Sequence, residues 1–150
     1  MLVTSPSLQS PSTGKIVTTG IVAGIIVDLF LILSHAAPFP GIYQFIASGL
    51  VGTAAFTSSG YIYLGLLLHL AISVIWAYIY VWIFQRYLAS VPWYGNGVLF
   101  GVIVMLGMQV VLLTKHLEPG FPGGGALIGL LVAHIVFFGL PVAYLLRSRG

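Results

Sequence analysis

The chain has 150 residues, of which 59% are hydrophobic and only 5% are charged. Soluble domains carry charge on about a quarter of their residues, because a polar shell must separate the apolar core from water. Five basic and two acidic residues cannot form that shell, so the composition predicts a protein whose solvent is a lipid bilayer. The basic residues are also too few for nucleic-acid binding, and the lack of cysteine excludes disulfides and thiolate metal ligands.

The N-terminal segment is polar and uncharged. Residues 1–14 are rich in Ser, Thr and Pro and have no periodic apolar pattern, so they bury too little surface to fold. We expect a disordered cytoplasmic tail over 1–14 and a single transmembrane domain over 15–150. The apolar run from Ile16 is longer than the core of about 7–15 residues found in signal peptides, so we expect it to be retained as the first helix.

Four apolar segments are long enough to cross a membrane, since about 20 helical residues span roughly 30 Å of hydrocarbon. They cover residues 16–36, 61–85, 96–114 and 125–146. These lengths predict an all-α integral membrane bundle of four transmembrane helices.

A further apolar segment, Tyr43 to Phe56, lies between the first two spans and has about 14 residues. This length is too short to cross the hydrocarbon, and Ser48 and Gly49 interrupt it. We therefore predict a short interfacial or re-entrant helix. The residues that mark it are Gln44, Ala47, Ser48 and Gly49.

The positions of Lys and Arg predict the orientation, because these residues concentrate in short cytoplasmic loops. With four spans and the N-terminus inside, four of the five basic residues are cytoplasmic and only Lys115 is outside. A fifth crossing through Tyr43 to Phe56 would move three of them outside. We expect a multi-pass inner-membrane protein with both termini cytoplasmic, and we expect Tyr43 among the aromatic anchors of the outer interface.

Glycines four residues apart recur in three spans, and this spacing lets helix backbones approach closely. The pairs are Gly20 with Gly24, Gly97 with Gly101, and Gly125 with Gly129. We expect packing seams inside the bundle, and the alternative is a homodimer face. Pro141 lies inside the fourth span and is expected to kink it near the cytoplasmic end, because proline donates no backbone hydrogen bond.

Each span contributes one polar residue at a similar depth, and these residues form the candidate site. They are Asp28, His69, Gln109 and His134. Asp28 and His69 each lie eight residues below the outer end of their span, a depth of about 12 Å, so we expect them to meet between neighbouring helices. An acid inside the membrane costs several kcal/mol unless it is neutral, paired or facing water, so Asp28 requires a partner.

Three interpretations of this polar cluster are open. In the first, Asp28 is protonated or bonded to His69, and the cluster stabilises the bundle through hydrogen bonds between helices. In the second, Asp28 and His69 exchange a proton in a transporter whose entry is lined by residues 47–60. In the third, His69 and His134 are the axial ligands of a haem, or form a two-His, one-carboxylate metal site with Asp28.

The function expected from these features is a structural or accessory subunit of a membrane assembly, because the chain has almost no extramembrane mass. A proton- or cation-linked small-solute transporter is the alternative, and bis-histidine haem binding is the second alternative. An enzyme is not expected, because the two acids, Asp28 and Glu118, lie at different depths and form no catalytic pair. The expected partners are the lipid bilayer and a larger complex or a homo-oligomer.

Three stretches covering about half of the chain carry a resemblance to known proteins. They are Asp28 after the Gly-containing start of the first span, Gln44-Phe45-Ile46-Ala47-Ser48-Gly49-Leu50, and Gly65-Leu66-Leu67-Leu68-His69 followed by Trp76-Ala77 and Tyr80. In these stretches the chain resembles a family of small, uncharacterised four-span bacterial inner-membrane proteins. The resemblance implies that Asp28, residues 46–49 and His69 hold the characteristic positions of the family, and it implies no substrate or cofactor. The chain departs from the family at Thr114-Lys115-His116, where Pro and Ser are expected.

Overall fold

The computed structural model describes residues 10–34, 39–114 and 124–147, and within these ranges the chain is helical and contains no strand. Four helices are long and apolar enough to cross a membrane: Thr13–Leu33, Gly60–Tyr87, Trp93–Val111 and Leu127–Leu146. A shorter apolar helix, Gly41–Phe56, lies between the first two. The predicted fold class is therefore confirmed, and the ends of the spans differ from the predicted ends by three residues or fewer.

The first helix, α1 (Thr13–Leu33), begins earlier than expected because a serine caps it. Ser12 is extended, and its hydroxyl accepts a hydrogen bond from the backbone N–H of Lys15 at 3.3 Å. This bond satisfies one of the backbone donors that every helix start leaves unpaired. Most of the predicted disordered tail, residues 1–9, lies outside the described ranges, as do Lys115, Glu118 and Arg149.

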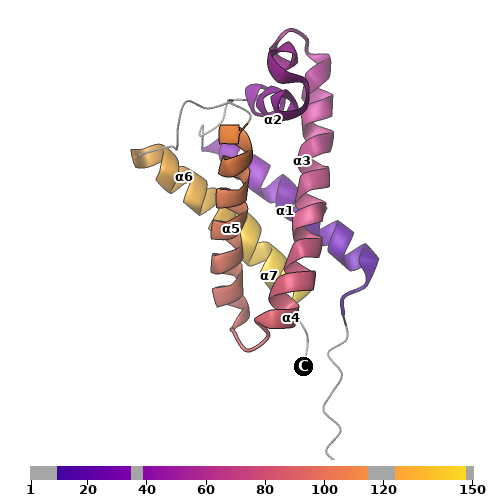
Figure 1. Cartoon of the computed structure of the whole chain (residues 1–150), viewed down its shortest axis with the longest axis vertical. Coiled ribbons are helices and arrows are strands. Elements are labelled where there is room, and N and C mark those ends of the chain that lie inside the picture. Colours follow the sequence, from indigo (N-terminus) through magenta and orange to yellow (C-terminus); the bar gives the residue numbers. More distant parts are fainter. Residues whose placement is uncertain (1–9, 35–38, 115–123, 148–150) are drawn as a thin grey trace, which may run out of the picture.

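Figure 1 shows that α1 crosses α3 (Gly60–Ile79). The first glycine pair lies at this crossing. A Cβ atom on Gly20 would lie 2.6 Å from Cα of Val74, and one on Gly24 would lie 2.7 Å from Oγ of Ser73. Both distances are too short for a side chain. At Gly20 the two backbones are in direct contact, and at Gly24 the backbone of α1 contacts the side chain of Ser73. Gly20 and Gly24 therefore form a tight seam between α1 and α3.

The second glycine pair lies between α5 (Trp93–Thr114) and the fourth span. A Cβ atom on Gly97 would lie 2.9 Å from Cδ2 of Leu140, and one on Gly101 would lie 2.6 Å from Cα of Ile135. The third pair behaves differently, because Cβ atoms on Gly125 and Gly129 would meet nothing within 4 Å among the residues that the structure describes. The prediction of a packing seam at this third pair is wrong, since α6 (Gly124–His134) leans away from α5 at its start (Figure 1).

The fourth span changes its helical form at the predicted position of the kink. α6 is followed by a five-residue π-helix, Ile135–Gly139, and then by α7 (Leu140–Leu146). The N–H of Leu140 donates to the carbonyl of Ile135, five residues earlier, and the next residue, Pro141, has no N–H to donate. A wider helical turn therefore lies directly before the proline. The second span contains a π-helix of the same length, Tyr80–Phe84, without a proline.

An aromatic cluster holds the second, third and fourth spans together around Phe100, which is fully buried. The ring of Phe100 has four neighbours, with centroids 5.1 to 6.2 Å away. They are Trp76, Tyr80, Phe84 and Phe138. Aromatic pairs at these distances contribute about 0.5–1.5 kcal/mol each beyond the area that they bury.

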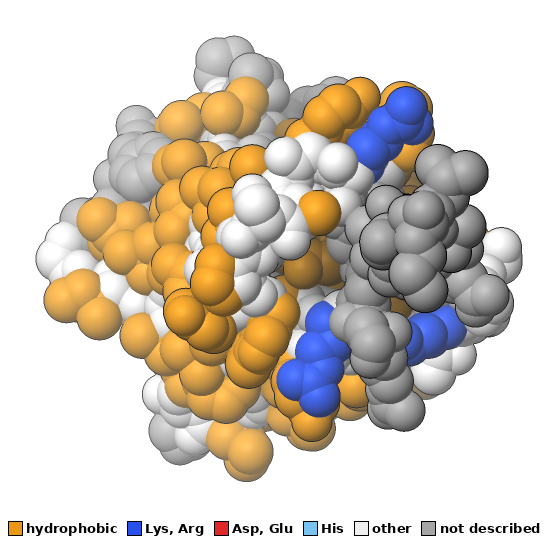
Figure 2. All heavy atoms as spheres, turned by 90° about the horizontal axis from the view of Figure 1, so that it is seen from below, with side chains coloured by type: hydrophobic (Ala, Val, Ile, Leu, Met, Phe, Trp, Pro, Cys, Tyr) orange, Lys and Arg blue, Asp and Glu red, His pale blue; other side chains and the backbone are white. Residues whose placement is uncertain are grey.

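The two ends of the bundle differ in character. At the upper end in Figure 1, α2 (Gly41–Val51) and the 3₁₀-helix Gly52–Phe56 pack against α3. At the lower end, α1 begins and α7 ends, and α4 (Gln85–Tyr87) completes the second span. Figure 2, a view from below, shows basic side chains on this end. The Lys and Arg residues within the described ranges are Lys15, Arg86 and Arg147.

Candidate functional site

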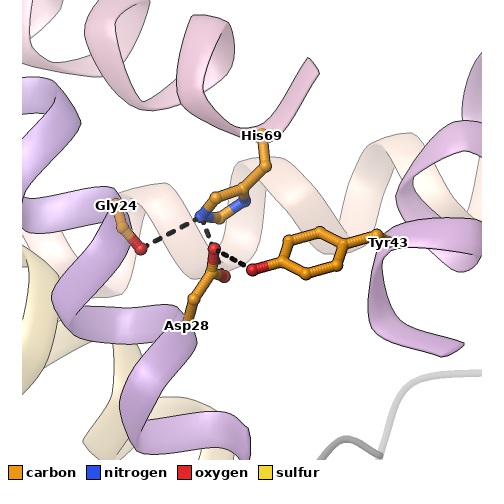
Figure 3. Close-up of polar contacts among 4 residues, drawn as sticks. All are labelled: Gly24, Asp28, Tyr43 and His69. Atoms are coloured by element: carbon orange, nitrogen blue, oxygen red, sulfur yellow. Dashed lines mark hydrogen bonds and ion pairs between the residues drawn. The ribbon is translucent and has the colours of Figure 1, made fainter. Parts of the chain in front are cut away.

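Asp28 and His69 are in contact between α1 and α3 (Figure 3). Oδ1 of Asp28 lies 3.1 Å from Nε2 of His69, and the side chains are 5% and 18% exposed. The glycine seam explains the contact: Asp28 follows Gly24 by four residues, and His69 precedes Ser73 by four. Because Gly24 and Ser73 touch, the two ionisable side chains meet one helical turn farther along the crossing.

Nε2 of His69 faces two oxygen atoms. It forms a hydrogen bond of 3.3 Å with the carbonyl of Gly24, so Nε2 carries the hydrogen. Oδ1 of Asp28 is buried and receives no aligned hydrogen bond from the residues that the structure describes, so its contact with His69 is electrostatic. Asp28 therefore has one carboxylate oxygen without an aligned donor, directly beside an imidazole nitrogen.

The other carboxylate oxygen accepts a hydrogen bond from Tyr43. The hydroxyl of Tyr43 donates to Oδ2 of Asp28 at 3.0 Å, and Tyr43 is buried (Figure 3). Burial, together with the neighbouring Asp28, raises the pKa of Tyr43 to about 12, so the phenol remains a donor at neutral pH. The prediction that Tyr43 anchors the outer interface is wrong, because α2 directs this side chain into the site.

A glycine on α3 explains how α2 reaches the site. A Cβ atom on Gly65 would overlap the backbone carbonyl of Tyr43, so the backbone of α2 rests directly on α3. Gly65 and His69 are four residues apart and share one face of α3. This face therefore supports the backbone of Tyr43 and also carries the histidine of the site.

The residues that mark the short helix have different roles. Ala47 and Ser48 are buried, and Ala47 is one turn after Tyr43 on the packed face of α2. The hydroxyl of Ser48 donates to the carbonyl of Phe45 at 2.6 Å, a bond inside α2. Gln44 is half-buried, and a Cβ atom on Gly49 would meet nothing within 4 Å. Tyr43, rather than these residues, connects α2 to the Asp28–His69 pair.

The other two residues of the predicted cluster lie on α5 and α6. Gln109 is buried on α5. His134 is at the end of α6, and its Nδ1 forms a hydrogen bond of 2.8 Å with the carbonyl of Leu130 in the same helix. His134 is close enough to His69 for an electrostatic interaction. Tyr43 contacts Asp28 from α2, and His69 contacts α1 from α3, so both contacts join separate helices.

The geometry does not fit the haem and metal interpretations. Nε2 of His69 is directed at Asp28 and Gly24, so it does not point toward an iron atom shared with His134. In the ranges that the structure describes, no three His, Asp or Glu residues lie close enough together to hold a metal ion. Asp28, His69 and His134 are all within these ranges and do not form the two-His, one-carboxylate set.

The arrangement instead offers two positions for one proton. With a hydrogen on Nδ1 of His69 in both states, a proton on Nε2 leaves Asp28 as a carboxylate, whereas a proton on Oδ1 lets Asp28 donate to the unprotonated Nε2 3.1 Å away. The hydrogen bond from Tyr43 to Oδ2 is compatible with both states. Comparisons with known protein families, with curated proteins and with solved structures gave no match for this chain.

Proposed function

We propose that this chain is a small membrane protein that takes up and releases a proton at the Asp28–His69 pair, as part of proton- or cation-linked transport of a small solute. One observation carries the proposal: a buried carboxylate oxygen without an aligned donor lies 3.1 Å from an imidazole nitrogen. A carboxylate in apolar surroundings is destabilised, so a proton and the imidazole compete to neutralise it. Such a pair has two protonation states that differ in charge distribution.

The unequal exposure of the pair supports a direction of proton entry. The side chain of His69 is 18% exposed and that of Asp28 only 5%. For proton transport the exposed surface of His69 must face a path open to water, along which the imidazole takes up the proton before the carboxylate. Because Tyr43 holds Asp28 from α2, a change of charge on Asp28 acts directly on the short helix. This link couples proton binding to the position of α2.

The proposed orientation follows from the basic end of the bundle. Lys15, Arg86 and Arg147 belong to helix ends on the side opposite α2. The positive-inside rule assigns such an end to the cytoplasm, so both termini are cytoplasmic and α2 is on the outer side. Location in a bacterial inner membrane, and membership of the four-span family that the sequence resembles, are parts of the same proposal.

Proton movement is testable without knowledge of the solute. The protein is reconstituted into liposomes that contain a pH-sensitive dye, and a potassium diffusion potential drives protons inward. We expect the wild type to acidify the lumen faster than protein-free liposomes, and Asp28→Asn to abolish the difference, because the amide cannot exchange a proton.

Tyr63→Phe is the matched control, because Tyr63 is 72% exposed on α3 and is not part of the site. This variant should retain the wild-type rate. If the wild type does not exceed protein-free liposomes, or if Asp28→Asn matches the wild type, proton transport by this pair is rejected.

A second candidate function, an accessory subunit of a membrane assembly, is favoured by the exposed face of α3. The second span is the least buried of the four, with 17% of its most apolar stretch buried against 39% in α1. Large apolar side chains at helical spacing form the exposed face: Tyr63, Leu67, Ile75, Tyr78 and Trp82. Native mass spectrometry after purification in mild detergent tests this function, since a subunit should retain its larger partners.

A further inference from the structure

The lower end of the bundle carries an aromatic and cationic cluster that takes no part in the proposed proton transfer. The guanidinium carbon of Arg147 lies 4.1 Å from the centroid of the Tyr144 ring. Trp93, at the start of α5, packs edge-on against the same ring at 5.4 Å. Both rings are partly exposed. Stacking on Tyr144 holds the Arg147 side chain in one direction and leaves the edge of its guanidinium free to donate.

A hydrogen bond brings a second arginine to the same end. Nε2 of Gln85 donates to the carbonyl of Leu146, so the last turn of the second span is tied to the end of α7. The residues that follow these two partners are Arg86 and Arg147. The bond therefore brings together two helix ends that each present a guanidinium group, although the residues are far apart in the chain.

Neither arginine has an acidic partner among the residues that the structure describes. Asp28 is the one acid in these ranges, and it is buried in the site with His69 and Tyr43. The two guanidinium groups instead lie over aromatic rings, that of Tyr87 for Arg86 and that of Tyr144 for Arg147. Two cations without a carboxylate attract an anion from outside the chain.

We propose that Arg86 and Arg147, with Trp93 and Tyr144, bind the phosphate of an anionic phospholipid headgroup. Arginine donates two parallel hydrogen bonds to a phosphate, and tryptophan and tyrosine lie at the headgroup level of a bilayer. The exposed side chains beside the cluster are apolar, among them Trp82, Ile83 and Leu145. Figure 2 shows basic side chains next to apolar ones on this end, an arrangement that fits a headgroup with its acyl chains.

The apolar surroundings favour a lipid over free phosphate. The bilayer covers the neighbouring apolar surface, so the two arginines lie beside lipid headgroups, whereas inorganic phosphate would have to enter this layer from water. A phospholipid can bind the charged and the apolar part of this surface at once. Its phosphate accepts hydrogen bonds from the guanidinium groups, and its acyl chains cover Trp82 and Leu145. The site therefore prefers phosphatidylglycerol to phosphatidylcholine, whose headgroup has no net charge.

The test is competitive lipid retention measured by native mass spectrometry. The purified full-length protein is mixed with equal amounts of phosphatidylglycerol and phosphatidylcholine in detergent, and the bound lipids are counted. We expect the wild type to retain phosphatidylglycerol preferentially. Arg86→Gln and Arg147→Gln should each lower this preference by about fivefold. Lys15→Gln is the matched control, because it removes one charge from the same end without touching the cluster.

Three outcomes would overturn the proposal. An equal loss in Lys15→Gln would mean diffuse attraction to the basic end rather than a site. Displacement of phosphatidylglycerol by millimolar inorganic phosphate would mean that the arginines bind free phosphate. Equal retention of the two lipids by the wild type would mean that the cluster does not select anionic headgroups.

Discussion

The backbone carbonyl of Tyr43 rests on Gly65, and the phenol of the same tyrosine donates to Asp28. One residue of the short helix α2 is therefore fixed at both its backbone and its side chain. Gly65 lies one helical turn before His69 on α3, so the contact that seats α2 adjoins the ionisable pair. The position of α2 and the environment of Asp28 are consequently linked through a single residue.

Substitution of Gly65 by alanine should displace α2 from its contact with α3. The new Cβ atom would overlap the carbonyl of Tyr43, and because the obstacle is backbone, the helix itself must move. We expect a loss of about 1–3 kcal/mol in the free energy of unfolding, measured in mixed micelles. Gly49→Ala is the control, since a Cβ atom at Gly49 meets nothing within 4 Å. Equal effects of the two substitutions would contradict the seating of α2 on Gly65.

Removal of the hydroxyl of Tyr43 should destabilise the site without changing its packing. Tyr43→Phe keeps the ring and leaves Oδ2 of Asp28 without its donor at 3.0 Å. We expect a loss of about 1–2 kcal/mol in the free energy of unfolding. The infrared bands of the Asp28 carboxyl, assigned by difference from Asp28→Asn, should shift in Tyr43→Phe. A spectrum unchanged by this substitution would show that the hydrogen bond is absent in the membrane.

The fold was predictable because the thickness of the membrane fixes the length that each spanning helix must have. Apolar runs of the right length identify four spans, and the distribution of Lys and Arg argues against a fifth. Details that depend on helix direction were not predictable. Gly125 and Gly129 have the same spacing as Gly97 and Gly101, but the start of α6 leans away from α5, so no neighbour in the described ranges approaches them. Spacing alone does not reveal whether a partner helix is near.

Half of the site could be predicted from depth. Asp28 and His69 were expected to meet because each lies eight residues from the predicted outer end of its span. The structure brings Oδ1 of Asp28 within 3.1 Å of Nε2 of His69, although the observed helices end at Leu33 and begin at Gly60. Tyr43 could not be assigned in this way, since a non-spanning helix has no fixed depth. Its role depends on how α2 lies on Gly65, a contact between two segments that sequence periodicity does not relate.

Energetic coupling between Asp28 and His69 can be measured with a double-mutant cycle of Asp28→Asn and His69→Gln. Loss of the histidine leaves a buried carboxylate without its neighbour, whereas the same change in the Asp28→Asn background leaves only a neutral amide. We expect a coupling energy of about 1–3 kcal/mol from unfolding in mixed micelles. Additive effects would mean that the two groups do not interact.

The control for this cycle is Asn96→Ala, which should combine additively with Asp28→Asn. Asn96 lies near the start of α5, where its side-chain amide donates to the carbonyls of Leu88 and Val91. It therefore stabilises the connection between the second and third spans at the end away from α2. Coupling between Asn96 and Asp28 as strong as that of the pair would indicate a general loss of structure instead of a specific interaction.

The glycine contacts predict that the same substitution changes the unfolding free energy differently at Gly101 and at Gly129. A Cβ atom on Gly101 would lie 2.6 Å from Cα of Ile135, so Gly101→Ala must separate α5 from the fourth span. We expect this substitution to cost about 1–3 kcal/mol of unfolding free energy in mixed micelles. Gly129→Ala adds the same methyl group where nothing lies within 4 Å, so it should leave the unfolding free energy of the isolated chain nearly unchanged. If Gly129→Ala destabilises the protein as much as Gly101→Ala, another surface covers the start of the fourth span, and the homodimer face considered for this glycine pair regains support.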